Sequence, residues 1–392
     1  MIRFVIGLLV LAWASIAFES LATGASAQSL QPRHSVIGYR VEPLLTQTGG
    51  GVAEGISNRG WVVGSACLAG CRFEHAFLWR DGVLTDLGTL GGPNSSEQWP
   101  VGDDRGLVVG AAETARRDPL SENVCGFGTG LICLGFLWHD GLKIALPPVG
   151  GNNSEALGVN NRGQVAGYGE TAARDPGCIP PQKLDFEALI WGPKSGEVTA
   201  LPPLTGDTIS GAVGIDDREQ VVGVSGTCSN PTRHAVLWHD GTVTNLGNLG
   251  GVLNTFPWAI NANGDIVGQS DLLGDSTTHA FLWTKQRGML DLGLLSGDGA
   301  SLAFGLNDRG DVVGGSCSDA SYQSCRAFLW QDGVLVDLNK LVCSPTSLHL
   351  FFGNDINDRG EIVGYAFDES KNEFVGFIAF PQIITRAVSR RC

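Results

Sequence analysis

Two loop segments of the sequence carry the same set of acidic and basic residues, and this set is suited to binding a polar ligand. The first reads Glu-Thr-Ala-Arg-Arg-Asp-Pro from Glu113, and the second reads Glu-Thr-Ala-Ala-Arg-Asp-Pro from Glu170. An arginine guanidinium binds a carboxylate through two parallel hydrogen bonds, and Asp or Glu accepts hydrogen bonds from hydroxyl groups. The candidate ligand-binding residues are therefore Glu113, Arg116, Arg117, Asp118, Glu170, Arg174 and Asp175.

The same residues admit two other interpretations. Carboxylates at the mouth of a channel could serve as the acids and bases of a carbohydrate-active enzyme, with arginines holding the substrate. Alternatively, an Arg–Asp pair could fold each loop, and duplication would have copied that device. The structural interpretation is favoured because repeats preserve structural devices first. The sequence contains no G-x-S-x-G or H-E-x-x-H motif, and it assigns no catalytic residue.

Both segments belong to a larger unit that recurs seven times along the chain. Its pattern is roughly I-N-D-R-G-x-V-V-G, then a variable loop, then H-A-F-L-W and an Asp-Gly turn. This pattern predicts four short strands separated by turns. In the first repeat the expected strands cover residues 53–57, 61–65, 75–79 and 83–87. We number the repeats 1 to 7, and they start near residues 53, 98, 156, 212, 257, 303 and 353.

Four antiparallel strands at this spacing predict an all-β fold, a seven-bladed β-propeller of four-stranded antiparallel blades. Repeat 7 has no clear fourth strand, whereas residues 38–44 form a strand pattern outside the repeats. We expect this N-terminal strand to complete the last blade and close the ring, which removes exposed sheet edges. An open stack of sheets, or a six-bladed ring with one degenerate unit, is the alternative.

The turn after the first strand ends on glycine in every repeat except the fourth, which has Glu219. Glycine reaches positive φ without steric cost, and glutamate does not. We therefore expect the turn of repeat 4 to take another geometry.

The third strand of several repeats contains a short sequence motif that is typical of a known family. It reads His75-Ala76-Phe77 in repeat 1, His279-Ala280-Phe281 in repeat 5 and, with one change, His234-Ala235-Val236 in repeat 4. The chain resembles the HAF family of probable extracellular repeats over nearly all of its length after residue 27. The resemblance implies a secreted bacterial propeller and brings no general activity with it. Because the histidines occupy equivalent places in separate repeats, we expect structural hydrogen bonds, and neither a metal nor a cofactor.

Ten cysteines follow residue 27. An even number of cysteines in an exported chain predicts disulfides. The expected pairs are Cys67–Cys71, Cys125–Cys133, Cys178–Cys228, Cys317–Cys325 and Cys343–Cys392. The pairs Cys67–Cys71, Cys125–Cys133 and Cys317–Cys325 each lie within a loop of a single repeat. Cys178–Cys228 would join equivalent loops of two successive repeats, and Cys343–Cys392 would fix the end of the chain. Zinc binding is the alternative, and it is disfavoured because no C-x-x-C pair is present.

The N-terminus combines a basic residue, an apolar run and Ala25-Ser26-Ala27, which predicts a signal peptide over residues 1–27. A membrane anchor is the alternative, but the run is short for spanning a bilayer. We expect one propeller domain over residues 28–381 and a C-terminal tail over residues 382–392. The mature chain is then secreted or held in the periplasm or at the cell surface. A net charge of −14 argues against nucleic acid as a partner.

The long loops and the crossovers between repeats should lie at one end of the blades, opposite the short turns. Function usually sits on loops mounted on a rigid scaffold. The leading hypothesis is a secreted, monomeric, non-catalytic propeller that binds an extracellular polysaccharide or protein through this disulfide-stapled loop face. The alternatives are an extracellular carbohydrate-active enzyme, either a lyase or a hydrolase, and a structural cell-surface protein.

Overall fold

The structure is a computed structural model that describes residues 37–44, 51–68, 72–97, 104–194, 196–229 and 232–383. The expected signal peptide lies outside these ranges, and so do residues 384–392 of the expected tail. The fold is all-β, and within the described ranges the one helix is a short 3-10 turn, η1 (Leu338–Leu341). No helix in this part of the chain is long and apolar enough to cross a membrane.

The strands form six sheets, of which five have four strands and one has eight. The strands of repeat 1 are β2 (Gly51–Ile56), β3 (Val62–Leu68), β4 (Phe73–Arg80) and β5 (Val83–Asp86). Those of repeat 2 are β6 (Gly91–Ser96), β7 (Val108–Arg117), β8 (Leu131–His139) and β9 (Leu142–Leu146). Those of repeat 3 are β10 (Ser154–Val159), β11 (Val165–Arg174), β12 (Leu184–Trp191) and β13 (Val198–Leu201).

Repeats 4 and 5 share the eight-stranded sheet through a single parallel pair, Arg233 with Asn254. The strands of repeat 4 are β14 (Ile209–Ile215), β15 (Val221–Gly226), β16 (Arg233–His239) and β17 (Thr242–Asn245). Those of repeat 5 are β18 (Gly250–Ile260), β19 (Ile266–Leu272), β20 (Thr278–Thr284) and β21 (Gly288–Gly293). Those of repeat 6 are β22 (Ala300–Leu306), β23 (Val312–Cys317), β24 (Cys325–Gln331) and β25 (Val334–Asp337).

The sheet of repeat 7 contains a strand from the other end of the chain. Its order is β1 (Ile37–Pro43), β28 (Glu373–Ile383), β27 (Ile362–Asp368) and β26 (Leu348–Ile356). β1 pairs antiparallel with β28, in a register that sets Val41 opposite Ala379. The strand expected over residues 38–44 therefore lies beside the last strand of the chain. β28 also runs past 381, the expected end of the domain.

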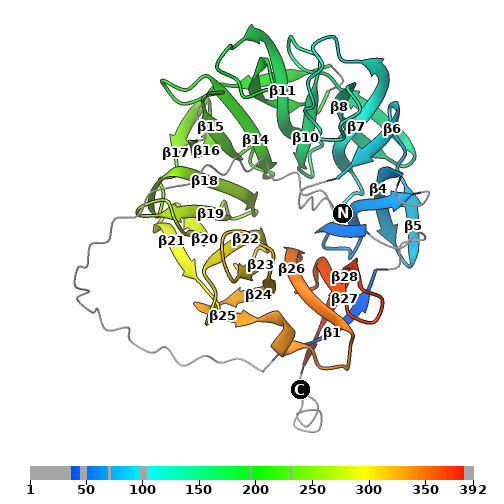
Figure 1. The fold of residues 1–392 in the computed structure, drawn as a ribbon, viewed down its shortest axis with the longest axis vertical. Helices are drawn as coiled ribbons and strands as arrows, with labels where there is room; N and C mark the ends of the chain where they lie inside the picture. The colour runs from blue at the N-terminus through cyan, green and yellow to red at the C-terminus, as the bar shows by residue number, and fades with distance from the viewer. Residues whose placement is uncertain are drawn as a thin grey trace.

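The sheets follow one another in chain order around a common centre (Figure 1). β2 contacts β26, β27 and β28, so the sheet of repeat 1 packs against the sheet of repeat 7. Apolar clusters fill the spaces between neighbouring sheets, and one of them joins Val63 of repeat 1, Phe136 of repeat 2 and Leu189 of repeat 3. Each sheet is thus covered on both faces, as its apolar second and third strands require.

The glycine that ends the apolar pair of the second strand recurs because the first strand passes very close to it. A Cβ at Gly64 would lie 2.0 Å from the carbonyl oxygen of Val52, a separation that no side chain can adopt. The equivalent glycines of the other repeats meet their first strands in the same way: Gly110, Gly167, Gly223, Gly268, Gly314 and Gly364. The recurrent glycine is therefore a packing requirement of the sheet.

A serine at the start of the first strand ties each of several sheets to the preceding one. Ser154 Oγ accepts the backbone N–H of Gly135 at 3.0 Å and donates to the carbonyl oxygen of Leu146 at 2.6 Å. Equivalent bonds are made by Ser95, Ser210 and Ser301. The sequence analysis did not single out these serines.

The short turns after the first strands bond to one another from repeat to repeat. Asn357 Nδ2 donates to the carbonyl oxygen of Ser57 at 3.0 Å, which joins repeat 7 to repeat 1. Asn160 and Asn307 make the same bond to the next repeat. The expected change of geometry at Glu219 is wrong: its φ is +62°, and its N–H bonds to the carbonyl of Asp216 as in the glycine turns. Neighbouring turns hold the backbone in place, so the residue takes up the strain.

Candidate functional site

Glu113 lies in the middle of β7, the second strand of repeat 2, and its side chain turns inward, where it is 1% exposed. Its Oε2 accepts the backbone N–H of Asn94 at 3.1 Å and the amide of the same residue at 2.8 Å. Its Oε1 accepts the hydroxyl of Thr129. These bonds hold β6 and the loop between β7 and β8 against β7.

Glu170 plays the same part in repeat 3 and is fully buried. Its Oε2 accepts the backbone N–H groups of Asn152 and Asn153, both at 2.9 Å. Asp118, 5% exposed, accepts the side-chain amide of Asn153 and the backbone N–H of Leu120, both at 2.5 Å. The candidate carboxylates therefore fold the loops through backbone and amide donors.

Other repeats show what this position does. The residue that corresponds to Glu113 and Glu170 is Cys317 in repeat 6, where it forms a disulfide across to Cys325. In repeat 5 it is Asp271, which accepts the hydroxyl of Thr278 at 2.7 Å. A disulfide and a buried carboxylate thus close the same end of the second and third strands in different repeats.

The basic candidates behave differently from the acidic ones. Arg116, Arg117 and Arg174 are exposed, and within the described part of the chain none of them forms an ion pair. Asp175 is partly exposed and accepts the backbone N–H of Gly177 at 2.7 Å. The Arg–Asp pairs that would fold each loop are not formed among these residues.

Glu122 is a further buried acid that the sequence analysis missed. It is 1% exposed, and its Oε1 accepts the backbone N–H groups of Lys183 at 2.7 Å and Leu184 at 3.0 Å. Burial raises the pKa of Glu122, and the nearby charges of Glu170 and Asp118 add to that shift. Its Ser-Glu-Asn segment has no counterpart in the other repeats, so no pattern could have drawn attention to it.

A hollow of about 450 Å³ opens beside these loops, where the crossover from repeat 2 to repeat 3 passes over β7 and β8. Arg116 is the one candidate residue that lines it. The full lining is Thr114, Arg116, Ile132, Leu134, Pro147, Pro148, Val149, Gly150, Gly151 and Asn152. An apolar wall with one guanidinium and a few polar groups is the usual composition of a small-molecule site.

A second, smaller hollow of about 170 Å³ lies at the opposite end, among the short turns. Several acidic and amide side chains line it, including Asp217, Asp308 and Asp358. Burial raises the pKa of Asp308, and its acidic neighbours contribute to the shift. These groups are occupied in bonds between turns: Asp308 Oδ1 accepts the N–H of Ala262 at 2.8 Å.

Three carboxyl groups on the first strands of their repeats have a strongly raised pKa. Burial raises the pKa of Glu54 to about 8 and those of Glu155 and Asp355 to about 7. Glu155 accepts the hydroxyl of Tyr168 at 2.6 Å, and burial keeps the pKa of Tyr168 well above its ordinary value. A protonated carboxyl near neutral pH suits general acid catalysis. The sequence analysis did not select these residues.

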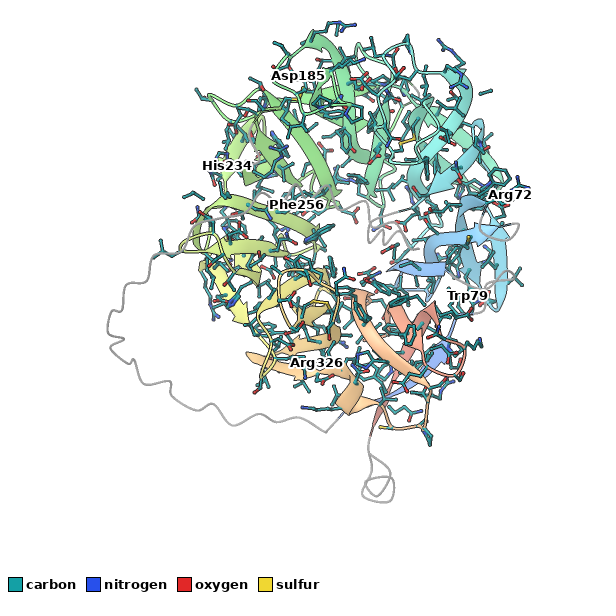
Figure 2. All side chains as sticks on the ribbon, viewed as in Figure 1. Arg72, Trp79, Asp185, His234, Phe256 and Arg326 are labelled. Carbon is teal, nitrogen blue, oxygen red and sulfur yellow. A yellow bond between two sulfur atoms is a disulfide. The ribbon has the colours of Figure 1, made fainter. Side chains whose placement is uncertain are left out.

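The repeated histidines each meet an aspartate. His75 Nδ1 lies 2.8 Å from Asp86 Oδ1, and His279 Nδ1 lies 2.9 Å from Asp291 Oδ1. His234 lies 3.3 Å from Asp207 and is farther from the common centre than Phe256 (Figure 2). His75 Nε2 also lies 3.2 Å from the carbonyl oxygen of Pro93 on β6, so this histidine links its sheet to the next one.

Three of the expected disulfides are present among the described residues: Cys125–Cys133, Cys178–Cys228 and Cys317–Cys325. Cys67 and Cys343 are also disulfide-bonded. Their expected partners, Cys71 and Cys392, lie outside the described residues.

Solved structures similar to this chain include an acylaminoacyl peptidase from Pyrococcus horikoshii, with 14% identity and a TM-score of 0.47 over 80% of this chain and 50% of the peptidase. A Trypanosoma rangeli sialidase shows 11% identity and a TM-score of 0.38 over 77% of this chain and 56% of the sialidase. The chain thus spans about half the length of these two proteins. TM-scores this low carry no argument about activity. No protein-family model matches the sequence, and no curated protein matches it.

Proposed function

We propose that the chain forms a closed, seven-bladed β-propeller in which β1 completes the last blade. Support comes from the pairing of β1 with β28 and from the contacts of β2 with the sheet of repeat 7. The hydrogen bonds between the turns of repeats 7 and 1, including Asp358 N–H to Asn58 Oδ1 at 2.8 Å, continue the bonds between the other turns. Membership of the HAF family, export through the signal peptide and a monomeric state belong to the same proposal.

The proposed function is non-catalytic binding of an extracellular acidic polysaccharide at the hollow between repeats 2 and 3. The observation that carries it is the position of Arg116, an exposed guanidinium without an ion pair among the described residues, beside an apolar wall in a hollow of about 450 Å³. A guanidinium binds a sugar carboxylate through two parallel hydrogen bonds, and proline and aliphatic side chains pack against a sugar ring.

One further observation supports binding over catalysis at this place, and the net charge limits the strength of that binding. Glu113, Asp118 and Glu170 are buried and engaged by the hydrogen bonds of their own loops, so their carboxylates are not presented to a ligand. The net charge of −14 repels an acidic polymer at long range, so attraction must come from the local arginines. Binding should therefore be specific to this patch and of modest strength.

An extracellular carbohydrate-active enzyme is the second candidate function. The observation that favours it is the raised pKa of Glu54 and Glu155, which keeps a proton on each carboxyl near neutral pH. Both residues lie on first strands, β2 and β10. This candidate predicts loss of polymer in the presence of the protein, which binding alone does not.

Affinity electrophoresis in gels that contain acidic or neutral polysaccharides tests both candidates. We expect retarded migration in an acidic polymer and about tenfold weaker retardation for Arg116→Gln, the effect of losing a charged hydrogen bond. Arg287→Gln, an equal change at an exposed arginine in a short turn of repeat 5, is the matched control and should migrate like the parent. Cleared zones would favour the enzyme, and a result with neither retardation nor clearing in any gel would overturn both candidates.

A further inference from the structure

The disulfide between Cys178 and Cys228 joins a loop of repeat 3 to a loop of repeat 4, and two carboxylates lie beside it. Asp175 follows β11, and Asp185 lies on β12, at the outer part of the repeat 3 sheet (Figure 2). One ligand atom from each of the four residues lies within 4.8 Å of the other three. Both cysteines are buried, and both aspartates are partly buried.

One of these carboxylates has an oxygen without a partner. Asp185 Oδ1 is buried and accepts no hydrogen bond from the described residues. Neither Asp185 nor Asp175 forms an ion pair within the described ranges, and Asp175 Oδ1 accepts only the N–H of Gly177. A buried oxygen left unpaired costs free energy, and a cation between the two carboxylates would remove that cost.

In the oxidised protein the sulfur atoms are bonded to each other and do not act as ligands. A tertiary phosphine reduces the disulfide: the phosphine and one water become the phosphine oxide, and the two sulfurs become thiols. Binding of a divalent cation then displaces a proton from each thiol and leaves two thiolates beside two carboxylates. Two sulfur and two oxygen donors form a ligand set that Zn²⁺ accepts in tetrahedral geometry.

We propose that reduction converts this cluster into a zinc site in which Cys178, Cys228, Asp175 and Asp185 each supply one ligand. In a tetrahedral site with ligands at about 2.0–2.3 Å from zinc, the ligand atoms lie roughly 3.3–3.8 Å apart. The two sulfur atoms, now bonded to each other, therefore move apart, and the two carboxylates close around the ion. The oxidised disulfide and the zinc-bound dithiol then form the same link between repeats 3 and 4. The inference is independent of the polysaccharide proposal.

The test uses the purified full chain, reduced with phosphine under argon and titrated with Zn²⁺ against a chromophoric chelator. We expect the reduced protein to bind about one zinc more than the Cys178→Ser/Cys228→Ser double variant does, the stoichiometry of one four-ligand site. The Cys317→Ser/Cys325→Ser variant removes a different cysteine pair and should keep that zinc. Co²⁺ in place of Zn²⁺ should give a thiolate charge-transfer band that the Cys178→Ser/Cys228→Ser variant lacks.

The Asp185→Asn variant distinguishes the proposed four-ligand site from zinc binding by the two cysteine thiolates alone. We expect the zinc affinity of the reduced protein to fall at least about tenfold in this variant, because a neutral amide is a poor zinc ligand. Equal zinc binding by the parent and the Cys178→Ser/Cys228→Ser variant would overturn the proposal, as would unchanged affinity in Asp185→Asn. Thermal unfolding with and without zinc covers the remaining case: a reduced chain that unfolds and gains no stability from zinc also contradicts it.

Discussion

Glu155 is one of three buried carboxyl groups whose raised pKa makes the stability of this protein depend on pH. It is 5% exposed, and burial raises its pKa to about 7 although Tyr168 donates a hydrogen bond to it. The folded state therefore holds a proton that the unfolded chain releases near pH 4.3, the ordinary value for glutamate. Between these values the folded state binds more protons than the unfolded one, so stability falls as the pH rises.

Glu155→Gln should flatten this decline, because glutamine still accepts the tyrosine hydroxyl but does not titrate. The parent should lose up to about 1.4 kcal/mol of unfolding free energy per pH unit between about pH 4.5 and pH 7 from this group. Thermal unfolding at several pH values in this window measures the slope. Glu369→Gln, at an exposed glutamate, is the control and should keep the parent slope. An unchanged slope in Glu155→Gln would contradict the buried proton.

Glu219 stores backbone strain, since its φ of +62° is costly for a residue with a Cβ. Glu219→Gly should raise the unfolding free energy by about 1 kcal/mol, less the small contribution of its exposed ion pair with Arg162. The reverse change at the equivalent turn, Gly163→Ala, where φ is +83°, should lower it by a similar amount. Denaturant unfolding compares the two, and a loss of stability in Glu219→Gly would show that the turn is not strained.

At the scale of elements, serine hydroxyls join one sheet to the next. Ser154→Ala would leave the buried N–H of Gly135 without its acceptor. We expect the unfolding free energy to fall by about 1–3 kcal/mol, the cost of an unpaired buried donor. Ser318→Ala, at an exposed serine just after β23, should change it little. Equal effects of the two substitutions in denaturant unfolding would rule out the inter-sheet role.

Strand positions could be predicted because the turns and glycines that delimit them recur in the sequence. The orientation of the loop side chains could not, because it depends on partners from other segments. Glu113 turns inward to Asn94 on β6, and Glu170 turns inward to Asn153, which immediately precedes β10. Arg116 was identified as a binding candidate from its residue type, but the hollow beside it exists only once Pro147 and Pro148 of the crossover pass over β7 and β8.

At the scale of the whole molecule, β1 covers the outer edge of β28 in the last sheet. Deleting residues 37–43 would leave the outer edge of β28 unpaired. It would also remove Tyr39 from the apolar cluster that contains Leu338 and Phe377, and so expose part of that cluster. We expect a lower thermal transition and a concentration-dependent rise in light scattering, because open edges pair with other chains. If the variant that lacks residues 37–43 unfolded at the same temperature as the parent and showed no rise in light scattering, this would contradict the closed ring.

The antiparallel pairing of β1 with β28 also has a mechanical consequence. Ile37 lies opposite Ile383, so the two ends of the described chain leave the sheet at the same place. A pulling force applied at these ends would load the hydrogen bonds one after another, as in opening a zipper, and would not shear them together. Although many packed sheets hold the fold together, it should therefore yield to a small force at its termini, beginning at this pair of strands.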